Sequence, residues 1–443
     1  MMRVHIHTLG CRVNQYESVA IAEALEKRGA AVCKDGEEIC DFYILNTCAV
    51  TAESQRQSRQ LARRFAGRGK TAVLGCASQN AKEEFLAIPG VFYVGGCTDK
   101  LQVVDAILST AGESSADRVR AVDRTYEKME IDGRSDLFSV CRGYIKIQDG
   151  CSGHCTYCVI PSLRGPSRSR PAEEVVAEAE RLVLSGCREV VLTGIETSAY
   201  SAAPLQELLL RLAELEPLGL ARVRLGSLSP GTLREDFLRG AAEAGNFMPH
   251  VHLSLQSGAD RVLRLMRRPY TAGEVLERIH LLRSYLPRVL ISADFITGFP
   301  TETEEEALAT EEFVREAGLF HVHAFPYSER AGTPAATMEG QLSMEVRKAR
   351  CSRLNAVANE NRERILDGFM GRSVRVLVER CRNGVANGHT EEFLECIFPA
   401  AGVQVGDICD VVVVGRSDGK LQGNHQGTPS PNPNAMRSDF PLA

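Results

Sequence analysis

Residues 141–170, CRGYIKIQDGCSGHCTYCVIPSLRGPSRSR, decide how the rest of the chain is interpreted. Cys151, Cys155 and Cys158 follow a strand-like run with the spacing Cys-x3-Cys-x2-Cys. Three close thiolates at this spacing can ligate three irons of a 4Fe-4S cube and leave the fourth iron open. A structural zinc site normally has four ligands. The alternatives are therefore a redox pair, or a zinc knuckle with His154 as the local fourth ligand.

The composition is that of an ordinary protein with two or three domains, because the 443 residues are 44% hydrophobic and 25% charged. Fifteen cysteines in a long chain without a signal-peptide pattern indicate metal ligation in a reducing compartment. No apolar run approaches the ~20 residues of a membrane span. We therefore expect a cytoplasmic protein without membrane contact. Because the net charge is −5, the chain as a whole does not attract RNA. Any RNA contact must therefore come from local basic runs, at 63–70, 164–170 and 264–268.

Residues 1–110 alternate between strand and helix patterns, which predicts parallel strands with right-handed crossovers. The expected strands are 4–9, 42–46, 71–74 and 91–94, and the expected helices are 16–28, 52–65, 80–86 and 99–108. This pattern predicts a flavodoxin-like or Rossmann-like domain. No Gly-x-Gly-x-x-Gly follows the first strand, so dinucleotide binding is a poor explanation of the domain.

Three further cysteines follow consecutive expected strands: Cys11 the first, Cys48 the second and Cys76 the third. The carboxyl ends of parallel strands meet at one edge of a sheet, so the three thiols can converge on one site. We favour a second cluster there over three buried small hydrophobic residues. Cys97 follows the fourth strand, and a fourth ligand from it stays open.

Residues 141–370 contain six strand–helix repeats after the polar linker expected at 111–140. The expected strands are 144–148, 189–192, 222–226, 252–255, 289–296 and 320–325. Six parallel strands with polar loops at their carboxyl ends predict an α/β fold with a full or partial TIM-type barrel. The charged helix at 344–369 is expected to leave the barrel.

Residues 371–423 carry β-branched runs and Asn-Gly turns, which predict a small antiparallel β-barrel of the OB or a related kind. This segment holds six Lys or Arg against seven Asp or Glu, which is not the charge pattern of a strong RNA binder. A structural cap on the central barrel is the alternative role. Residues 424–443 are expected to be disordered.

The stretch 145–170 resembles the radical S-adenosylmethionine enzymes, and in particular their methylthiotransferase branch. TLGCRVNQYES (8–18), NTCAVTAESQRQSRQ (46–60) and LGCASQ (74–79) look like the cysteine motifs of the methylthiotransferase N-terminal domain. The runs 225–230, 252–271, 294–306 and 321–336 resemble the bacterial enzymes that modify N6-threonylcarbamoyladenosine in tRNA. Ser229 and the run 197–201 depart from that branch. The C-terminal segment resembles a TRAM domain, which grips RNA in these enzymes.

The resemblance implies roles for individual residues. Cys151, Cys155 and Cys158 would hold the catalytic 4Fe-4S cluster, which binds S-adenosylmethionine and generates a 5′-deoxyadenosyl radical. Cys11, Cys48 and Cys76 would hold an auxiliary 4Fe-4S cluster that carries the sulfur to be transferred. Further residues are expected at the S-adenosylmethionine site: Tyr157 against adenine, Thr193, Gly194 and Glu196 at its amino group, Ser254 and Gln256 at ribose and carboxylate, and Arg164, with Arg168, at the carboxylate or a substrate phosphate.

The function implied is insertion of a methylthio group at C2 of N6-threonylcarbamoyladenosine at position 37 of tRNA. An aromatic C–H bond is too strong for acid–base catalysis, so such chemistry is delegated to a cofactor radical. The partners implied are tRNA, a flavodoxin-like or ferredoxin-like electron donor, and a sulfur source. The alternatives are the same reaction on isopentenyladenosine of tRNA or on a ribosomal-protein aspartate, a non-catalytic iron–sulfur RNA-binding or redox-sensing protein, and a zinc structural protein.

Overall fold

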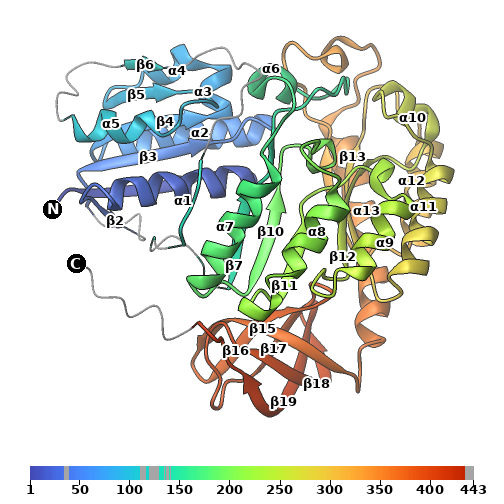
Figure 1. Ribbon diagram of the computed structural model, residues 1–443. Helices are drawn as coiled ribbons and strands as arrows, with labels where there is room; N and C mark the ends of the chain where they lie inside the picture. Colours follow the sequence, from blue (N-terminus) through green and yellow to red (C-terminus); the bar gives the residue numbers. More distant parts are fainter. Residues whose placement is uncertain are drawn as a thin grey trace.

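The computed structural model shows an α/β layer in blue, a central body from green to orange, and a β-barrel in red (Figure 1). The α/β layer lies beside the central body, and the red barrel lies beneath it. The described residues are 1–33, 39–109, 116–118, 129–133, 135, 139 and 141–434. Within them, no helix is long and apolar enough to cross a membrane.

The N-terminal domain has one sheet of six parallel strands in the order β2-β1-β3-β4-β5-β6, the flavodoxin-like order with a further edge strand. The strands are β1 (Arg3–Thr8), β2 (Ala31–Cys33), β3 (Phe42–Thr47), β4 (Lys70–Gly75), β5 (Val91–Gly95) and β6 (Ala116–Arg118). The predicted parallel sheet is confirmed. The sequence pattern missed β2 and β6 because three residues are too few to show a period.

Helices cover both faces of this sheet because its inner strands are apolar on both sides. The helices are α1 (Arg12–Glu26), α2 (Ala52–Ala66), α3 (Cys76–Asn80), α4 (Lys82–Leu86) and α5 (Gln102–Leu108). Leu25 of α1 and Ile107 of α5 are buried in one apolar cluster. Phe65 of α2 and Phe85 of α4 are buried in another, on the opposite face.

The central body is a partial barrel of six parallel strands. The strands are β7 (Arg142–Lys146), β10 (Glu189–Thr193), β11 (Arg222–Leu225), β12 (His250–Gln256), β13 (Leu290–Thr297) and β14 (His321–Pro326). They form two three-stranded sheets, and two isolated parallel bridges, Val223 to Phe247 and Leu228 to Leu253, join the halves. Within the described residues, β7 and β14 are not paired with each other. Of the two forms predicted, the partial barrel is the one present.

Helices follow the barrel strands and cover the outer face. They are α7 (Ala172–Leu184), α8 (Leu205–Ala213), α9 (Glu235–Glu243), α10 (Asp260–Leu265), α11 (Ala272–Tyr285) and α12 (Glu304–Glu316). Alternation along β12 buries Val251, Leu253 and Leu255 in the core, while His252 and Ser254 are less buried. Polar side chains therefore line the inner face of the partial barrel, which we call the lumen.

The expectation that the charged helix leaves the barrel is wrong. Helix α13 (Met344–Asp367) packs along β14 and α12, and several of its charged and polar side chains are buried. Arg347 donates from Nη1 to the Tyr327 carbonyl over 2.9 Å, and Asn361 donates from Nδ2 to the Val314 carbonyl over 2.8 Å. Leu354, Val357 and Ala358 are also buried, but polar residues continue this short apolar stripe on both sides, so hydrophobic periodicity gave little sign of the packing.

The last five strands form a closed barrel in the order β15-β16-β17-β19-β18. They are β15 (Ser373–Arg382), β16 (Val385–Thr390), β17 (Glu395–Pro399), β18 (Ile408–Ser417) and β19 (Lys420–Ser430). All neighbours pair antiparallel except β17 with β19.

The expected domain end at 423 and the expected disorder of 424–443 are wrong as far as residue 434. Strand β19 continues through Asn424 and His425, which pair with β18. Asn434 is buried and donates from Nδ2 to the carbonyls of Val183 and Leu218, over 2.8 and 3.0 Å. The polar residues of this part of β19 are ordered because their backbone hydrogen-bonds with β18, and this pairing does not require apolar side chains. Residues 435–443 lie outside the described part of the chain.

The expected linker at 111–140 is only partly described. It contributes β6 to the N-terminal sheet. Further on, the Met129 carbonyl accepts from the Tyr16 hydroxyl of α1, and the Ile131 amide donates to Glu178 of α7 over 3.1 Å. This segment therefore packs between the first two domains.

Phe393, between β16 and β17, fastens the C-terminal barrel to the central body. Its ring stacks on His250 with centroids 4.8 Å apart. The guanidinium carbons of Arg142 and Arg224 lie 5.0 and 4.9 Å from its centroid. Its φ of +70° is rare for a residue with a side chain, so the surrounding contacts must hold it there.

Phe393→Ala is expected to destabilise this interface by about 2–3 kcal/mol, because a packed aromatic ring and two cation–π contacts are lost. Urea unfolding followed by far-ultraviolet circular dichroism measures the effect. Phe393→Leu keeps apolar area and loses the ring face, so it should cost less. An unchanged unfolding curve for the alanine variant would show that the ring does not hold the barrel in place.

Candidate functional site

The cysteine loop of the central body is shaped by a short backbone pairing. β8 (Gln148–Asp149) pairs antiparallel with β9 (Arg168–Ser169), which folds 150–167 into a closed loop. Gly150 opens this loop with a φ of +71°, and a Cβ there would lie 2.1 Å from the Pro166 carbonyl oxygen. Only glycine fits this turn. The loop then returns through α6 (Ile160–Arg164).

The thiols of Cys151, Cys155 and Cys158 gather in this loop. The Gly153 amide donates to Cys151 Sγ over 3.3 Å, and a Cβ on Gly153 would lie 3.2 Å from Cys151 Sγ and 4.0 Å from Cys155 Sγ. The absence of a side chain at Gly153 thus leaves space between two sulfurs. Burial raises the pKa of Cys158 to about 12, so a bound cationic cluster would displace a proton from that thiol. Three soft donors around an open space fit a cubane cluster.

Arg268 is a site residue that the sequence analysis missed, because it treated 264–268 only as an RNA-binding run. Its Nη1 donates to Cys155 Sγ over 3.3 Å, its Nη2 to the Ser254 carbonyl over 3.0 Å, and its Nε to the Tyr270 hydroxyl over 2.8 Å. The Tyr157 side chain also interacts electrostatically with the Arg268 guanidinium. Nothing in the spacing of 113 residues between Arg268 and Cys155 indicated this contact.

The predicted residues Thr193, Gly194 and Glu196 lie at the carboxyl end of β10, against Gln148. Gln148 Oε1 accepts from the Glu196 amide over 2.9 Å. A Cβ on Gly194 would lie 2.8 Å from the same oxygen, so the close approach requires glycine. Gln148 Nε2 also donates to the carbonyl of Gly150 over 2.7 Å. The segment is thus held directly to the cysteine loop by Gln148, which the sequence analysis did not single out.

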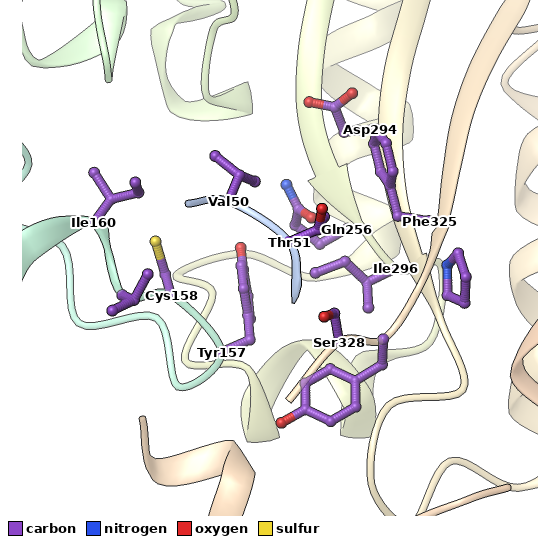
Figure 2. A pocket seen from close by; sticks show the side chains of 13 residues that line it. Val50, Thr51, Tyr157, Cys158, Ile160, Gln256, Asp294, Ile296, Phe325 and Ser328 are labelled. Carbon is purple, nitrogen blue, oxygen red and sulfur yellow. The ribbon is translucent and has the colours of Figure 1, made fainter. Parts of the chain in front are cut away.

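Ser254 and Gln256 lie at the end of β12, where the register shifts against β13. Gln256 has a φ of +75°, a left-handed conformation that turns its side chain out of the strand pattern. It lines a cavity of about 190 Å³ together with Tyr157 and Asp294. Figure 2 shows Gln256 between the tyrosine and the aspartate.

The second cysteine trio lies at the carboxyl edge of the N-terminal sheet. Cys11 precedes α1, Cys48 follows β3, and Cys76 opens α3. A Cβ on Gly10, whose φ is +91°, would lie 2.8 Å from Cys48 Sγ, so the first loop passes close to the second. Burial raises the pKa of Cys48, and the nearby Cys76 and Cys11 thiols raise it further. The structure thus brings together the three thiols that the sequence predicted to converge.

Cys97 lies beside this trio, with its Sγ 3.7 Å from Cys76 Sγ. The pKa of Cys76 is lowered to about 6 by the hydrogen bond from Cys97 and then by the positive charges of Arg164 and Lys100. A stabilised thiolate is the form that ligates metal. The site therefore offers three predicted donors and a fourth sulfur next to one of them.

Arg164 does not lie where the resemblance placed it. Its side chain is 0% exposed, and Nη1 donates to Asp149 over 3.0 Å and to Glu17 over 3.1 Å. Its Nη2 donates to Asn14 over 2.7 Å, and its Nε donates to Cys76 Sγ over 3.3 Å. This guanidinium is fully used at the second cysteine trio, so it cannot also face the carboxylate of a cofactor bound at the first.

The basic run 164–170 is likewise not an RNA-binding surface. Arg168 is 6% exposed and donates to the Arg164 and Pro166 carbonyls, while Arg170 is 0% exposed and pairs with Glu178. These arginines are buried and connect segments within the protein.

The cavity contacts the loop that carries the first cysteine trio and the residues that follow Cys48 of the second. Val50 and Thr51, which follow Cys48, form one wall, while Tyr157 to Ile160 form the wall around Cys158. Ile296 and 325–328 from the barrel strands close the remaining side. A molecule in this cavity would touch residues next to both sets of thiols.

Comparisons with known proteins agree with this geometry. The "Radical SAM superfamily" model matches residues 145–314, and the "Uncharacterized protein family UPF0004" model matches residues 3–96. A solved structure of the radical S-adenosylmethionine methyltransferase TsrM from Kitasatospora setae aligns with a TM-score of 0.56 at 17% identity, covering 76% of this chain and 75% of that one. This likeness supports the fold.

Curated relatives match over nearly the full chain. The Bacillus subtilis protein named threonylcarbamoyladenosine tRNA methylthiotransferase MtaB is 33% identical and covers 94% of each chain. The Thermotoga maritima protein of the same name is 35% identical over 94% of this chain and 96% of its own. An Erythrobacter litoralis protein named tRNA-2-methylthio-N(6)-dimethylallyladenosine synthase is 33% identical, with coverages of 94% and 96%.

The partial barrel, the three-thiol loop after its first strand and the family match define a radical S-adenosylmethionine enzyme. Enzymes of this class work with a 4Fe-4S cluster and S-adenosylmethionine. Because these relatives are 33% and 35% identical over 94% of this chain, the chain belongs to the methylthiotransferase family of radical S-adenosylmethionine enzymes.

Arg164→Met is expected to lower the free energy of unfolding by about 3 kcal/mol, because Glu17 and Asp149 stay buried with one cation fewer. Urea unfolding measures the loss. The surface pair of Arg59 with Glu84 supplies the matched control, since Arg59→Met should cost less than about 1 kcal/mol. Equal effects of the two substitutions would contradict the interdomain role of Arg164.

Proposed function

We propose that the protein inserts a methylthio group at C2 of N6-threonylcarbamoyladenosine at position 37 of tRNA. The observation that carries the proposal is the cavity walled on one side by residues after Cys48 and on the other by the Cys158 loop. A base in that cavity would touch residues next to both thiol sites that the reaction needs. The choice of nucleoside is supported by relatives whose names specify threonylcarbamoyladenosine.

In this proposal, Cys151, Cys155 and Cys158 hold one 4Fe-4S cluster, and Cys11, Cys48 and Cys76 hold another. When bound, these groups and S-adenosylmethionine supply radical hydrogen abstraction at one site and sulfur at the other. The chain supplies position and seclusion. Thr193, Gly194, Glu196, Ser254, Gln256 and Tyr157 surround the S-adenosylmethionine site.

The walls of the cavity suit a flat base with a polar substituent. Val50, Ile160, Ile296 and Phe325 offer apolar surface to the faces of an adenine ring. Thr51, Asp294 and Ser328 add polar groups around it. Apolar walls with a few placed polar groups are typical of small-molecule sites.

Contact with the rest of the tRNA is assigned to the C-terminal barrel, as a TRAM-like domain, and to exposed arginines elsewhere. Arg380 and Arg382 are exposed at the end of β15, and Arg63 of α2 is exposed on the N-terminal domain. The balanced charge of the barrel means that a local face must make the contact. An electron donor and a sulfur source complete the set of partners that we propose.

The second candidate substrate is dimethylallyladenosine of tRNA. The relative named for that nucleoside has the same identity and coverage as the first, 33% over 94% of this chain. The two substrates differ in the substituent on N6, which is polar and carries a carboxylate in one and is a hydrocarbon in the other.

A deletion strain is expected to lose the methylthio form of N6-threonylcarbamoyladenosine from its tRNA, as measured by mass spectrometry of digested tRNA. The intact gene should restore it, and a variant with Cys11, Cys48 and Cys76 all changed to Ala should not. Loss of the methylthio form of dimethylallyladenosine instead would move the assignment to the second substrate. Persistence of both modified nucleosides would contradict the tRNA assignment.

The same triple variant is expected to retain about half the iron, since wild type should hold about eight irons per chain as two cubane clusters. It should still form 5′-deoxyadenosine from S-adenosylmethionine under reducing conditions. Anaerobic iron and sulfide analysis gives the count. Cys187→Ala, a buried cysteine away from both trios, is the matched control and should bind as much iron as wild type. An unchanged count in the triple variant would refute the N-terminal cluster.

Arg268→Gln is expected to leave the iron content unchanged and to lower the reduction potential of the first cluster by on the order of tens of millivolts. Loss of a cationic donor next to Cys155 makes the added electron less stable. Redox titration followed by electron paramagnetic resonance measures the potential. Arg267→Gln removes the same charge from an exposed neighbour and should have a smaller effect. Equal potentials in wild type and Arg268→Gln would exclude this tuning.

A further inference from the structure

Three side chains of types that can bind a metal ion lie close together in the lumen, apart from both cysteine trios. They are His252 of β12, Asp294 of β13 and His323 of β14. One ligand atom from each lies within 4.8 Å of the others. Asp294 is the direct register partner of His323, so their side chains share a face of the sheet.

The orientation of His252 is fixed by a neighbour. Its Nδ1 lies 2.8 Å from Ser292 Oγ, and its Nε2 lies 3.1 Å from Asp294 Oδ2. Ser292 Oγ is in turn 3.0 Å from His250 Nε2. Histidines that bind metals usually have the second ring nitrogen held by such a partner, which directs the first nitrogen at the metal.

His323 supplies the third donor from a more open position. It is exposed at the lumen, and its ring meets the His321 ring edge-on with centroids 4.4 Å apart. Imidazole nitrogens are donors that suit divalent transition metals.

We propose that His252, Asp294 and His323 bind one divalent transition-metal ion. Two imidazole nitrogens and one carboxylate oxygen suit zinc, iron(II) or manganese and leave further coordination positions open. Asp294 lines the cavity of the candidate site, so those open positions would face it. In Figure 2 the aspartate lies at one end of the cavity, beside Phe325. The competing explanation is a simple ion pair between His252 and Asp294.

The test is a titration of the reconstituted holoenzyme, freed of tRNA, with Mn²⁺ at room temperature. Free Mn²⁺ gives an electron paramagnetic resonance signal that is lost on binding, oxidised 4Fe-4S clusters are silent under these conditions, and Mn²⁺ has little affinity for the remaining thiols. One Mn²⁺ should bind per chain, and one equivalent of Zn²⁺ should displace it.

His252→Ala, Asp294→Asn and His323→Ala should each weaken Mn²⁺ binding by at least about tenfold. His280→Ala removes an exposed histidine from the outside of α11 and is the matched control, which should bind like wild type. Circular dichroism and iron content verify that each variant is folded and loaded. Absence of Mn²⁺ binding by wild type, or equal affinity in wild type and Asp294→Asn, would overturn the site and leave the ion pair.

Discussion

The buried guanidinium of Arg164 is the interaction on which the arrangement of the site depends. It leaves the cysteine loop of the central body and ends among Asn14, Glu17 and Cys76 of the N-terminal domain. Burial alone would raise the pKa of Glu17, yet Arg164, with Lys100 and Lys146, lowers it well below its usual range. The carboxylate is therefore charged, and separating the domains would remove its contacts with Arg164 and Lys146 and leave only Lys100. One network thus sets the spacing between the two trios.

The opposite end of the central body is fastened in the same way. Glu189 is fully buried beneath the lumen, and Arg142, Arg222 and Arg224 surround it and keep its pKa lowered against the effect of burial. Arg222 and Arg224 also donate to carbonyls of the C-terminal barrel, including those of His389 and Thr390. Buried ion pairs add little net stability over apolar packing, but they penalise every misplaced arrangement. The contacts between domains are thus suited to fixing geometry.

The chemistry-bearing cysteines and the order of elements could be predicted from sequence because both follow local rules. Thiols at the ends of consecutive parallel strands must share an edge, and Cys11, Cys48 and Cys76 do. The roles of Gln148 and Arg268 could not be predicted. Each depends on a contact between segments far apart in the chain, and neither belongs to a pattern with a period. Arg164 was misplaced for a related reason: an arginine beside a cofactor loop has the same local sequence whether it faces the ligand or the neighbouring domain.

The size of the cavity explains why the shared motifs leave the substrate open. About 190 Å³ is less than the ~300 Å³ at which ligand sites usually begin, so in the proposed reaction a base would take up the cavity and its N6 substituent would have to extend beyond it. The centre is built by residues that flank Cys48 and Cys158, which any enzyme with this chemistry needs. In the proposed reaction, selection between a carboxylate-bearing and a hydrocarbon substituent would depend on polar residues of the cavity wall such as Asp294 and Ser328. The cysteine motifs carry no information about these residues, which lie instead in the runs 294–306 and 321–336 that resemble the threonylcarbamoyladenosine enzymes.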